Sequence, residues 1–349
     1  MTLDINPAPP EVMHIDLNSA FAMTEQQANP LLRGKPVGIT NRLNNFAICI
    51  TASYEAKTQG VGIGTRVGMA RQLAPDFVIL EADPAKYMYV HSRLRQIFDS
   101  YSPTSYMKSV DEDIIDFKGM APILKGRPLE DVAAEIKQRV KDEIGDYMSV
   151  NIGIGQNRWL AKVAASLFKP DGLFTIDRDN LLLVYAMLNL TDLPYINYRY
   201  ERRLHEAGIY TPLELYHTPE HILTKQVFKS INGHHWHLKL RGYETEVAFG
   251  LRTIGRSYVL EHRTDDPREF AALLHKSCTK IARRLARKGS ASRHDLVGKS
   301  SEGGGLGKRP PRSAVVRPPA PRRSPDGPPP PRSPPPSVPP PCAARGPTA

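Results

Sequence analysis

The 349-residue chain has only three cysteines, and Cys49, Cys278 and Cys342 lie far apart in the sequence. Thiols in an odd number, without a CxxC pair, predict neither a disulfide framework nor a cysteine metal site, and they are typical of a reducing compartment. No stretch approaches the roughly 18 apolar residues that a membrane span needs. Residues 1–10 lack the basic start and apolar core of a signal peptide. We therefore expect a cytoplasmic protein without a membrane partner.

Excess basic charge is also scarce in most of the chain, although the whole sequence is strongly basic. The net charge of +11 and the pI of about 9.5 favour a polyanionic partner. Residues 290–349 contain ten Lys and Arg against three Asp and Glu, a net charge of +7, so the first 289 residues carry only +4. The overall charge is therefore weak support for nucleic-acid binding.

The composition changes sharply near Gly289. Seventeen of the 32 prolines lie beyond it, in runs such as 328–331 and 339–341. A segment of this kind cannot bury a core, so we expect a disordered, Pro- and Arg-rich tail at 290–349.

The preceding residues predict a mixed body of helices and strands. Short apolar runs predict strands at 13–17, 46–52, 77–81 and 147–154, and a strand or hairpin at 106–117. Apolar residues three and four apart predict helices at 84–101 and 129–144. Their inward faces would hold Tyr87, Val90, Leu94, Ile97 and Phe98 in the first helix and Val132, Ile136 and Val140 in the second. The order strand, helix, strand pair, helix, strand is that of a ferredoxin-like sheet, so the predicted fold class is α+β.

Two of the apolar stretches carry carboxylates. Asp16 lies in the first strand, and Asp111 and Glu112 lie in the run Ser-Val-Asp-Glu at 109–112. Acidic groups that converge in a fold repel one another unless cations lie between them, and Mg²⁺ prefers such ligands while leaving positions open for phosphates. Two such ions activate a hydroxyl and stabilise a leaving pyrophosphate. These residues therefore predict nucleotidyl transfer.

Two alternatives stay open for the acidic pair. An isolated Asp-Glu pair is most often a solvated turn. Adjacent residues on a flat strand also point to opposite faces, whereas Asp111 and Asp113 would share one. Asp111 and Glu112 would serve one site only if the backbone turns or bulges there, so the local pattern supports Asp111 with Asp113 equally well.

Residues 51–57 combine a hydroxyl, an aromatic ring and a cation, in Thr51, Tyr54 and Lys57. The phenol and the cation are suited to phosphate oxygens. The alternative, an ordinary helix start capped by Ser53, is equally consistent with the sequence.

Gly153 and Gly155 follow the predicted strand at 147–154, and Lys169 follows the next helical segment. Glycines at a strand-to-helix turn let the backbone approach a phosphate, but this signal alone is weak. Lys169 is either a triphosphate contact or a surface lysine at a helix end, and spacing alone favours the latter.

Two downstream segments are suited to DNA. Short helices around a tight turn within 193–215 either present backbone N–H groups to a DNA phosphate or form a plain helical hairpin. Asp266, Pro267 and Glu269 open a basic helix with a cap, a first-position proline and an acidic first turn. Its basic side chains either line a DNA backbone or form a solvated face, which is the commoner case.

The order of these motifs resembles that of the Y-family translesion DNA polymerases of the bacterial DNA polymerase IV (DinB/UmuC) type. The resemblance runs from about Met13 to Gly289 and is most specific up to Gly172. It implies a right-hand fold with a ferredoxin-like palm. The implied parts are an N-terminal extension at 1–11, a palm at 12–19 and 83–176, fingers at 20–82, a helix-hairpin-helix-like thumb at 177–243 and a partial little finger at 250–289.

The resemblance also assigns residue roles. Asp16, Asp111 and Glu112 match the catalytic metal carboxylates, with the Leu17 carbonyl as a further ligand, for two Mg²⁺ ions per active site. This favours Glu112 over Asp113. Phe21 matches the aromatic steric gate that excludes a 2′-hydroxyl, and the nucleotide-binding set is Phe21, Thr51, Tyr54, Lys57 and Lys169.

The implied reaction is template-dependent, low-fidelity transfer from a dNTP to a primer 3′-hydroxyl, in DNA repair and damage tolerance. The implied partners are primer–template DNA and dNTPs, with the chain acting as a monomer. The family also implies a sliding-clamp partner, but no C-terminal Gln-x-x-aromatic clamp-binding peptide is visible.

Several positions depart from the family pattern. Lys57 stands where arginine is usual, which removes a bidentate phosphate contact. Asn18 and Ala20 replace an acidic and an aromatic residue. Asp113 and Ile114 replace a small residue and an aromatic one, and the thumb hairpin has Tyr195-Ile196-Asn197 where Gly-Ile-Gly is typical.

The little-finger pattern stops near Gly289, which suggests a truncated or frame-altered end. This leaves a non-catalytic or weakly active DNA-binding relative as an alternative function. A palm-type nucleotidyl cyclase is a third, which Lys169 with its neighbours 170–172 and the thumb-like segment disfavour.

Overall fold

The computed structural model describes residues 4–245, 255–256, 258 and 264–287, together with strands at 295–297 and 314–316. The chain divides into two compact units, Met1–Ala248 and Phe249–Ala349. Among the described residues, no helix combines the length and apolar character that crossing a membrane requires.

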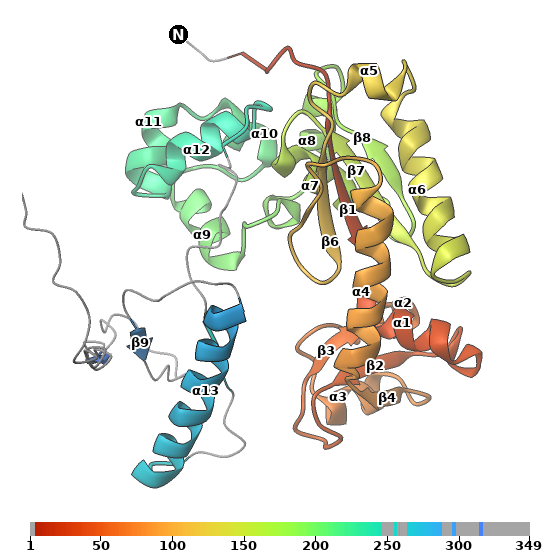
Figure 1. Ribbon diagram of the computed structural model, residues 1–349. Coiled ribbons are helices and arrows are strands. Elements are labelled where there is room, and N and C mark those ends of the chain that lie inside the picture. Colours follow the sequence, from red (N-terminus) through yellow and green to blue (C-terminus); the bar gives the residue numbers. More distant parts are fainter. Residues whose placement is uncertain are drawn as a thin grey trace, which may run out of the picture. The chain divides into compact units, whose positions relative to one another are not determined.

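A five-stranded sheet forms the centre of the first unit (Figure 1), in the order β5-β6-β1-β7-β8. Strand β1 pairs antiparallel with both β6 and β7, and β8 is parallel to β7. Helix α4 connects β1 to β5 after an inserted segment, and α6 connects β6 to β7, so the first four strands form the predicted ferredoxin-like arrangement. The elements are β1 (Val12–Leu17), α4 (Pro84–Asp99), β5 (Tyr106–Met107), β6 (Glu112–Asp116), α5 (Ala121–Leu124), α6 (Leu129–Glu143), β7 (Val150–Gly155) and β8 (Leu173–Thr175).

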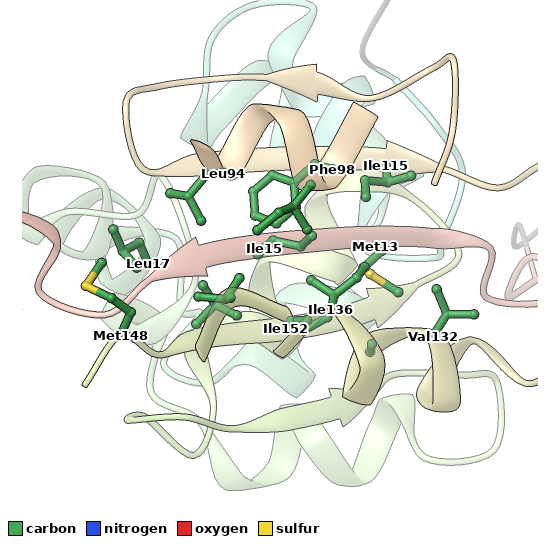
Figure 2. Close-up of a cluster of buried hydrophobic side chains, with 14 of the residues drawn as sticks. Met13, Ile15, Leu17, Leu94, Phe98, Ile115, Val132, Ile136, Met148 and Ile152 are labelled. Atoms are coloured by element: carbon green, nitrogen blue, oxygen red, sulfur yellow. The ribbon is translucent and has the colours of Figure 1, made fainter. Parts of the chain in front are cut away.

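Helices α4 and α6 cover one face of this sheet. Met13, Ile15 and Leu17 project from β1 into the core beneath them, because alternate residues of a strand point to the same face (Figure 2). All eight residues predicted for the inward helix faces are buried, so that prediction is confirmed. Each large apolar side chain contributes about 1.5–3 kcal/mol on burial. The remaining β1 residues, His14 and Asp16 among them, therefore point to the opposite face.

Helix α7 (Arg158–Ser166) lies against that opposite face. A Cβ atom on Gly153 would lie 2.1 Å from the Ala165 nitrogen and 2.2 Å from the Ala161 oxygen, and one on Gly155 would lie 2.6 Å from the Ala161 nitrogen. The two glycines thus allow helix and strand backbones to approach closely. Packing explains this motif, and the α7 backbone takes the space that the phosphate interpretation would need.

A second sheet, in the order β3-β2-β4, lies within the segment between β1 and α4. The sequence interpretation missed β2, and it began β3 three residues early. The Asn44 side chain accepts hydrogen bonds from the N–H groups of Phe46 and Ala47 (3.0 and 2.8 Å), which makes a turn where the apolar run predicted a strand. The elements are α1 (Ala20–Ala28), η1 (Pro30–Leu32), β2 (Val37–Thr40), β3 (Cys49–Ala52), α2 (Tyr54–Thr58), α3 (Val67–Leu73) and β4 (Val78–Glu81).

A helical region completes the first unit. Its core includes Tyr185, Leu204, Leu215 and Trp236, and it also takes in Trp159 from α7. Thr211 and Glu214 form a capping box at the start of α10. The elements are α8 (Leu181–Met187), η2 (Leu190–Asp192), α9 (Tyr198–Glu206), α10 (Pro212–His217), α11 (Glu220–Ile222), η3 (Leu223–Val227) and α12 (Asn232–Lys239).

The second unit contains helix α13 (Pro267–Arg287) and the paired antiparallel strands β9 (Asp295–Val297) and β10 (Ala314–Val316). The Asp266 carboxylate accepts from the Arg268 N–H at 2.9 Å, so the predicted cap is confirmed. Most of residues 250–263 of the predicted partial little finger, and most of the predicted disordered tail, lie outside the described residues. Cys49 is buried and Cys278 is exposed, both as free thiols.

Candidate active site

Asp16 and Glu112 occupy directly opposite positions on β1 and β6. Opposite residues of an antiparallel pair project from the same face, so both carboxylates lie on the α7 side of the sheet. Asp113 is opposite Ile15 and points the other way. It is fully buried and accepts hydrogen bonds from the Ser105 hydroxyl (2.9 Å) and the Tyr106 N–H (3.0 Å). The register therefore places Glu112, and not Asp113, beside Asp16.

Asp111 lies in a bend just before β6. The backbone therefore turns between the strand and Asp111, which is the condition under which Asp111 and Glu112 can serve one site. The N–H groups of Lys108 and Ser109 donate to the Glu112 carbonyl at 2.9 and 3.3 Å and close this segment. The Leu17 N–H donates to the Asp111 carbonyl at 2.9 Å. Residues 108–112, called the acidic turn below, are thereby held against the end of β1.

Two lysines on the α7 side neutralise this face. Lys162 of α7 donates to Glu112 Oε1 at 2.6 Å, and Lys169, which follows α7, pairs with Asp16. Burial raises the pKa of Asp16, Lys169 lowers it in part, and the Glu112 and Asp111 carboxylates raise it further. Because the charges of Glu112 and Asp111 act on Asp16, the three carboxylates form one region of negative charge.

His14 lies beneath the carboxylates, with Nε2 3.9 Å from Glu112 Oε2. Burial and the nearby Lys162 hold the pKa of His14 well below its usual value, so the ring is neutral. Sequence reasoning missed both His14 and Lys162. The alternation of β1 places position 14 on the face of position 16, but this signal names no partner, and nothing in the local spacing links Lys162 to Glu112, 50 residues earlier.

Helix α2 brings a second group of side chains to the residues that follow β1. Tyr54 donates to Asn18 Oδ1 at 3.1 Å, and Lys57 donates to the Ser19 hydroxyl at 2.7 Å while lying 4.3 Å from the Tyr54 ring centroid. Burial and the Asp16 charge raise the pKa of Tyr54 to about 12. Burial lowers the pKa of Lys57, and Lys169 lowers it further. Ser53 caps the helix, accepting from the Ala56 N–H at 3.3 Å, so the helix-start interpretation is confirmed.

Phe21 contacts helix α4, and Thr51 contacts its neighbour in β3. Phe21 of α1 stacks on Tyr87 of α4, with ring centroids 4.3 Å apart and planes inclined by 14°. The Tyr87 hydroxyl donates to Glu25 Oε1 at 3.0 Å, and Lys86 pairs with the same carboxylate at 2.5 Å. The Thr51 hydroxyl donates to the Ile50 carbonyl, and within the described residues no hydrogen bond joins it to the other predicted site residues.

Within the described part of the chain, no group of three or more His, Cys, Asp or Glu side chains stands ready to hold a metal ion. Lys162 and Lys169 occupy carboxylate oxygens, and Ser109 donates to Asp111. The donors nevertheless fit a hard divalent cation, because Asp16 and Glu112 share one face and the charges of Glu112 and Asp111 add to burial in raising the pKa of Asp16. A cation would supply the charge that the lysines supply here.

Comparison with known proteins assigns the family. The sequence pattern of the impB/mucB/samB family matches residues 15–166. The chain is 32% identical over 288 residues to the DNA polymerase IV of Pelotomaculum thermopropionicum, an alignment that covers 81% of this chain and 70% of the relative. The chain belongs to the Y family of DNA polymerases, in the DNA polymerase IV group.

Other Y-family comparisons agree. The DNA polymerase IV of Staphylococcus aureus strain JH9 is 26% identical over 277 residues, covering 78% of this chain and 76% of the relative. A Y-family polymerase chimera of Dbh and Dpo4 superposes with a TM-score of 0.68 at 25% identity, covering 78% of this chain and 80% of the other. DinB from Sulfolobus solfataricus superposes at 0.58 and 25% identity, covering 66% of each chain.

This Y-family member is therefore a DNA-directed DNA polymerase of the translesion type, and the predicted family, fold class and activity are confirmed. Y-family polymerases are nucleotidyltransferases that generally use divalent metal ions. Family membership removes the cyclase alternative, and the comparisons do not favour the non-catalytic one.

Proposed function

We propose that Asp16, Asp111 and Glu112, with the Leu17 carbonyl, hold two Mg²⁺ ions and that this site extends a DNA primer with dNTPs. The observation that carries the proposal is the opposition of Asp16 and Glu112, with the acidic turn bringing Asp111 to the same strand end. When bound, the two ions polarise the primer 3′-hydroxyl and the α-phosphate and neutralise the leaving pyrophosphate.

The chain's own cations supply the triphosphate contacts. Lys169 pairs with Asp16 and Lys57 donates to Ser19, so both cations lie at the end of β1. Tyr54 contacts the Lys57 ammonium through its ring and Asn18 through its hydroxyl. Lys57 is a single point charge, so it makes one phosphate contact where arginine would make two. Lys169 exchanges its carboxylate partner for a phosphate when the site is loaded. Thr51, which lies in β3, remains a predicted nucleotide contact.

Phe21 selects deoxynucleotides in this proposal. Its ring is fixed against Tyr87, which Glu25 holds through the phenol. Because stacking on Tyr87 prevents the Phe21 ring from moving away, a 2′-hydroxyl would clash with it, and ribonucleotides are excluded sterically. A small fingers segment encloses the nascent pair loosely, and fidelity is low because little beyond base pairing penalises a wrong base.

Several expectations remain predictions: primer–template DNA held by a thumb at 177–243 and a partial little finger at 250–289, the palm at 12–19 and 83–176, the fingers at 20–82, and the extension at 1–11. A monomeric state, a sliding-clamp partner and a cytoplasmic location are predictions of the same kind.

Two adjacent isosteric variants test the proposal, because Glu112 and Asp113 project from opposite faces. Glu112→Gln should lower primer extension on undamaged and abasic templates by about 10³-fold, since losing several kcal/mol of charge stabilisation corresponds to such a factor. Asp113→Asn is the matched control and should extend primers as the parent does. Asp111→Ala should be as inactive as Glu112→Gln. Full activity of Glu112→Gln together with an inactive Asp113→Asn would overturn the assignment.

A further inference from the structure

Tyr195 has a backbone conformation that a tyrosine rarely adopts. Its φ angle is 75°, in the left-handed region that favours glycine, and its side chain is 51% exposed. A residue with a Cβ atom is strained there, and such strain persists only where surrounding contacts fix the backbone. Contacts of Tyr195 and its neighbours must therefore hold this backbone in place.

The backbone around Tyr195 is firmly anchored. The Trp159 indole N–H donates to the Pro194 carbonyl at 3.3 Å, and Ile196 is buried in the core of the helical region. The Ile196 N–H donates to the Leu193 carbonyl at 3.1 Å. Tyr195 thus projects from a rigid segment tied to α7.

The Tyr195 hydroxyl accepts a hydrogen bond of 2.8 Å from Lys108. The Lys108 and Lys239 ammonium groups both lie 5.6 Å from the Tyr195 ring centroid. Lys108 is the first residue of the acidic turn, and its own N–H closes that turn on the Glu112 carbonyl. The contact therefore joins the helical region to the segment that carries Asp111 and Glu112.

The other supports of the acidic turn come from the sheet, from α4 and from α7, where Lys162 pairs with Glu112. Leu17 of β1 donates to the Asp111 carbonyl, and His91 of α4 donates through Nδ1 to the Val110 carbonyl at 3.0 Å. Each of these holds a residue in the middle or second half of the turn. Tyr195 holds its first residue, from the opposite side of the site.

We propose that Tyr195 is a positioning residue for the polymerase reaction. Its phenol holds Lys108, and through it the acidic turn, at the place where Asp111 and Glu112 face Asp16. Tyr195 thereby couples the helical region to the first residue of the acidic turn, in addition to the Lys162–Glu112 pair that α7 provides. The proposal rests on the roles proposed above for Asp111 and Glu112, and its first measurement does not depend on catalysis.

Tyr195→Phe removes the hydroxyl and keeps the ring. In the full chain, amide hydrogen exchange of the peptide that contains 108–112 should become faster, because the Lys108 and Ser109 N–H groups open more often. The kcat for single-nucleotide insertion should fall by about three- to tenfold, the effect of losing one solvent-exposed hydrogen bond of ordinary strength, while the Kd for primer–template DNA stays within about twofold.

Tyr198→Phe is the matched control. Tyr198 lies three residues on, is 68% exposed, and its hydroxyl accepts from the Arg199 side chain at 3.0 Å. It makes the same chemical change without touching Lys108, so exchange in the acidic turn and kcat should match the parent.

Tyr195→Gly separates positioning from structural support. Glycine relieves the left-handed strain, so the melting temperature should rise, while exchange in the acidic turn quickens and kcat falls. A purely structural role would move stability and activity in the same direction.

Parental exchange and kcat in Tyr195→Phe would overturn the proposal, as would a loss confined to DNA affinity. If Glu112→Gln stayed active while Tyr195→Phe quickened exchange, the assignment of the carboxylates would fail and the Tyr195–Lys108 coupling would stand.

Discussion

Asp16 lies directly opposite Glu112 across the β1–β6 pair, and each of the two carboxylates holds a lysine that α7 or the segment after it provides. The ammonium groups occupy the face of the sheet to which metal ions and triphosphate are proposed to bind. The site is thus neutralised by its own chain.

Lys162→Met removes the counter-charge of Glu112. The pair is about one-fifth exposed, so its loss should lower the free energy of unfolding by about 1–2 kcal/mol in EDTA, after allowance for solvent screening. Mg²⁺ should raise the melting temperature of the variant more than that of the parent, since the cation replaces the missing charge. Thermal unfolding with and without Mg²⁺ measures both effects. Lys225→Met, at an exposed lysine, is the control, and equal Mg²⁺ responses in all three proteins would contradict the prediction.

Asp113→Asn should stabilise the protein at alkaline pH. Burial raises the pKa of Asp113 to about 6, above its unfolded value of 3.8, so the stability it contributes is full below about pH 4 and is lost as pH rises through 6. Asparagine carries no charge: its side-chain oxygen can accept from the Tyr106 N–H, and its NH₂ group can donate to the Ser105 hydroxyl, which then acts as the acceptor. Denaturant titrations should show a gain approaching 3 kcal/mol at pH 8, from about two pKa units, and almost none at pH 4. A gain independent of pH would show that the carboxylate is not the cause.

Phe21→Ala should admit ribonucleotides. The stacked ring on Tyr87 is lost, and the space opens toward the sugar of an incoming nucleotide. The ratio of kcat/KM for dNTP over rNTP should fall by at least about tenfold. Steric exclusion by the ring is expected to raise the activation free energy for rNTP by more than about 1.4 kcal/mol, which is a factor of ten in rate. Tyr87→Phe, which keeps the stack and loses only the hydroxyl, should discriminate nearly as the parent does. Unchanged discrimination in Phe21→Ala would refute the gate.

Gly153→Ala should destabilise the protein strongly. The added Cβ would lie 2.1–2.2 Å from backbone atoms of Ala165 and Ala161, and backbone cannot move aside as a flexible side chain does. A loss of about 3 kcal/mol is expected, at the upper end for overpacking. Gly62→Ala, where no atom lies within 4 Å of the added Cβ, should change stability by less than about 1 kcal/mol. Equal denaturation midpoints for the two variants would contradict the packing account.

Periodic burial is the part of this fold that the sequence predicts well. The inward faces of α4 and α6 follow directly from apolar spacing. Strand β2 was missed because it is four residues long with Gly38 inside it, and Gly38 is required there since a Cβ would meet the Phe77 ring at 2.2 Å. The predicted start of β3 was three residues early, because the Asn44 side chain accepts hydrogen bonds from Phe46 and Ala47 and forms a turn within the apolar run.

The candidate site depends on partners far apart in the chain. Local alternation could not choose between Glu112 and Asp113, because the choice depends on which residue lies opposite Asp16, 96 positions earlier. Lys162 could not be predicted as a site residue, because its partner Glu112 is 50 residues away in the sequence. Spacing alone took Lys169 for a surface lysine, and only the fold brings it to Asp16.

Helix α7 belongs to two cores at once. Ala161 packs with Val12 and Ile114 of the sheet, while Trp159 and Leu160 are part of the core of the helical region. A graft of the helical region between relatives, cut at the predicted boundary between 176 and 177, would divide that second core and leave five of its twenty buried residues behind. The exchangeable module is longer than the predicted thumb by helix α7, which carries the lysine that pairs with Glu112.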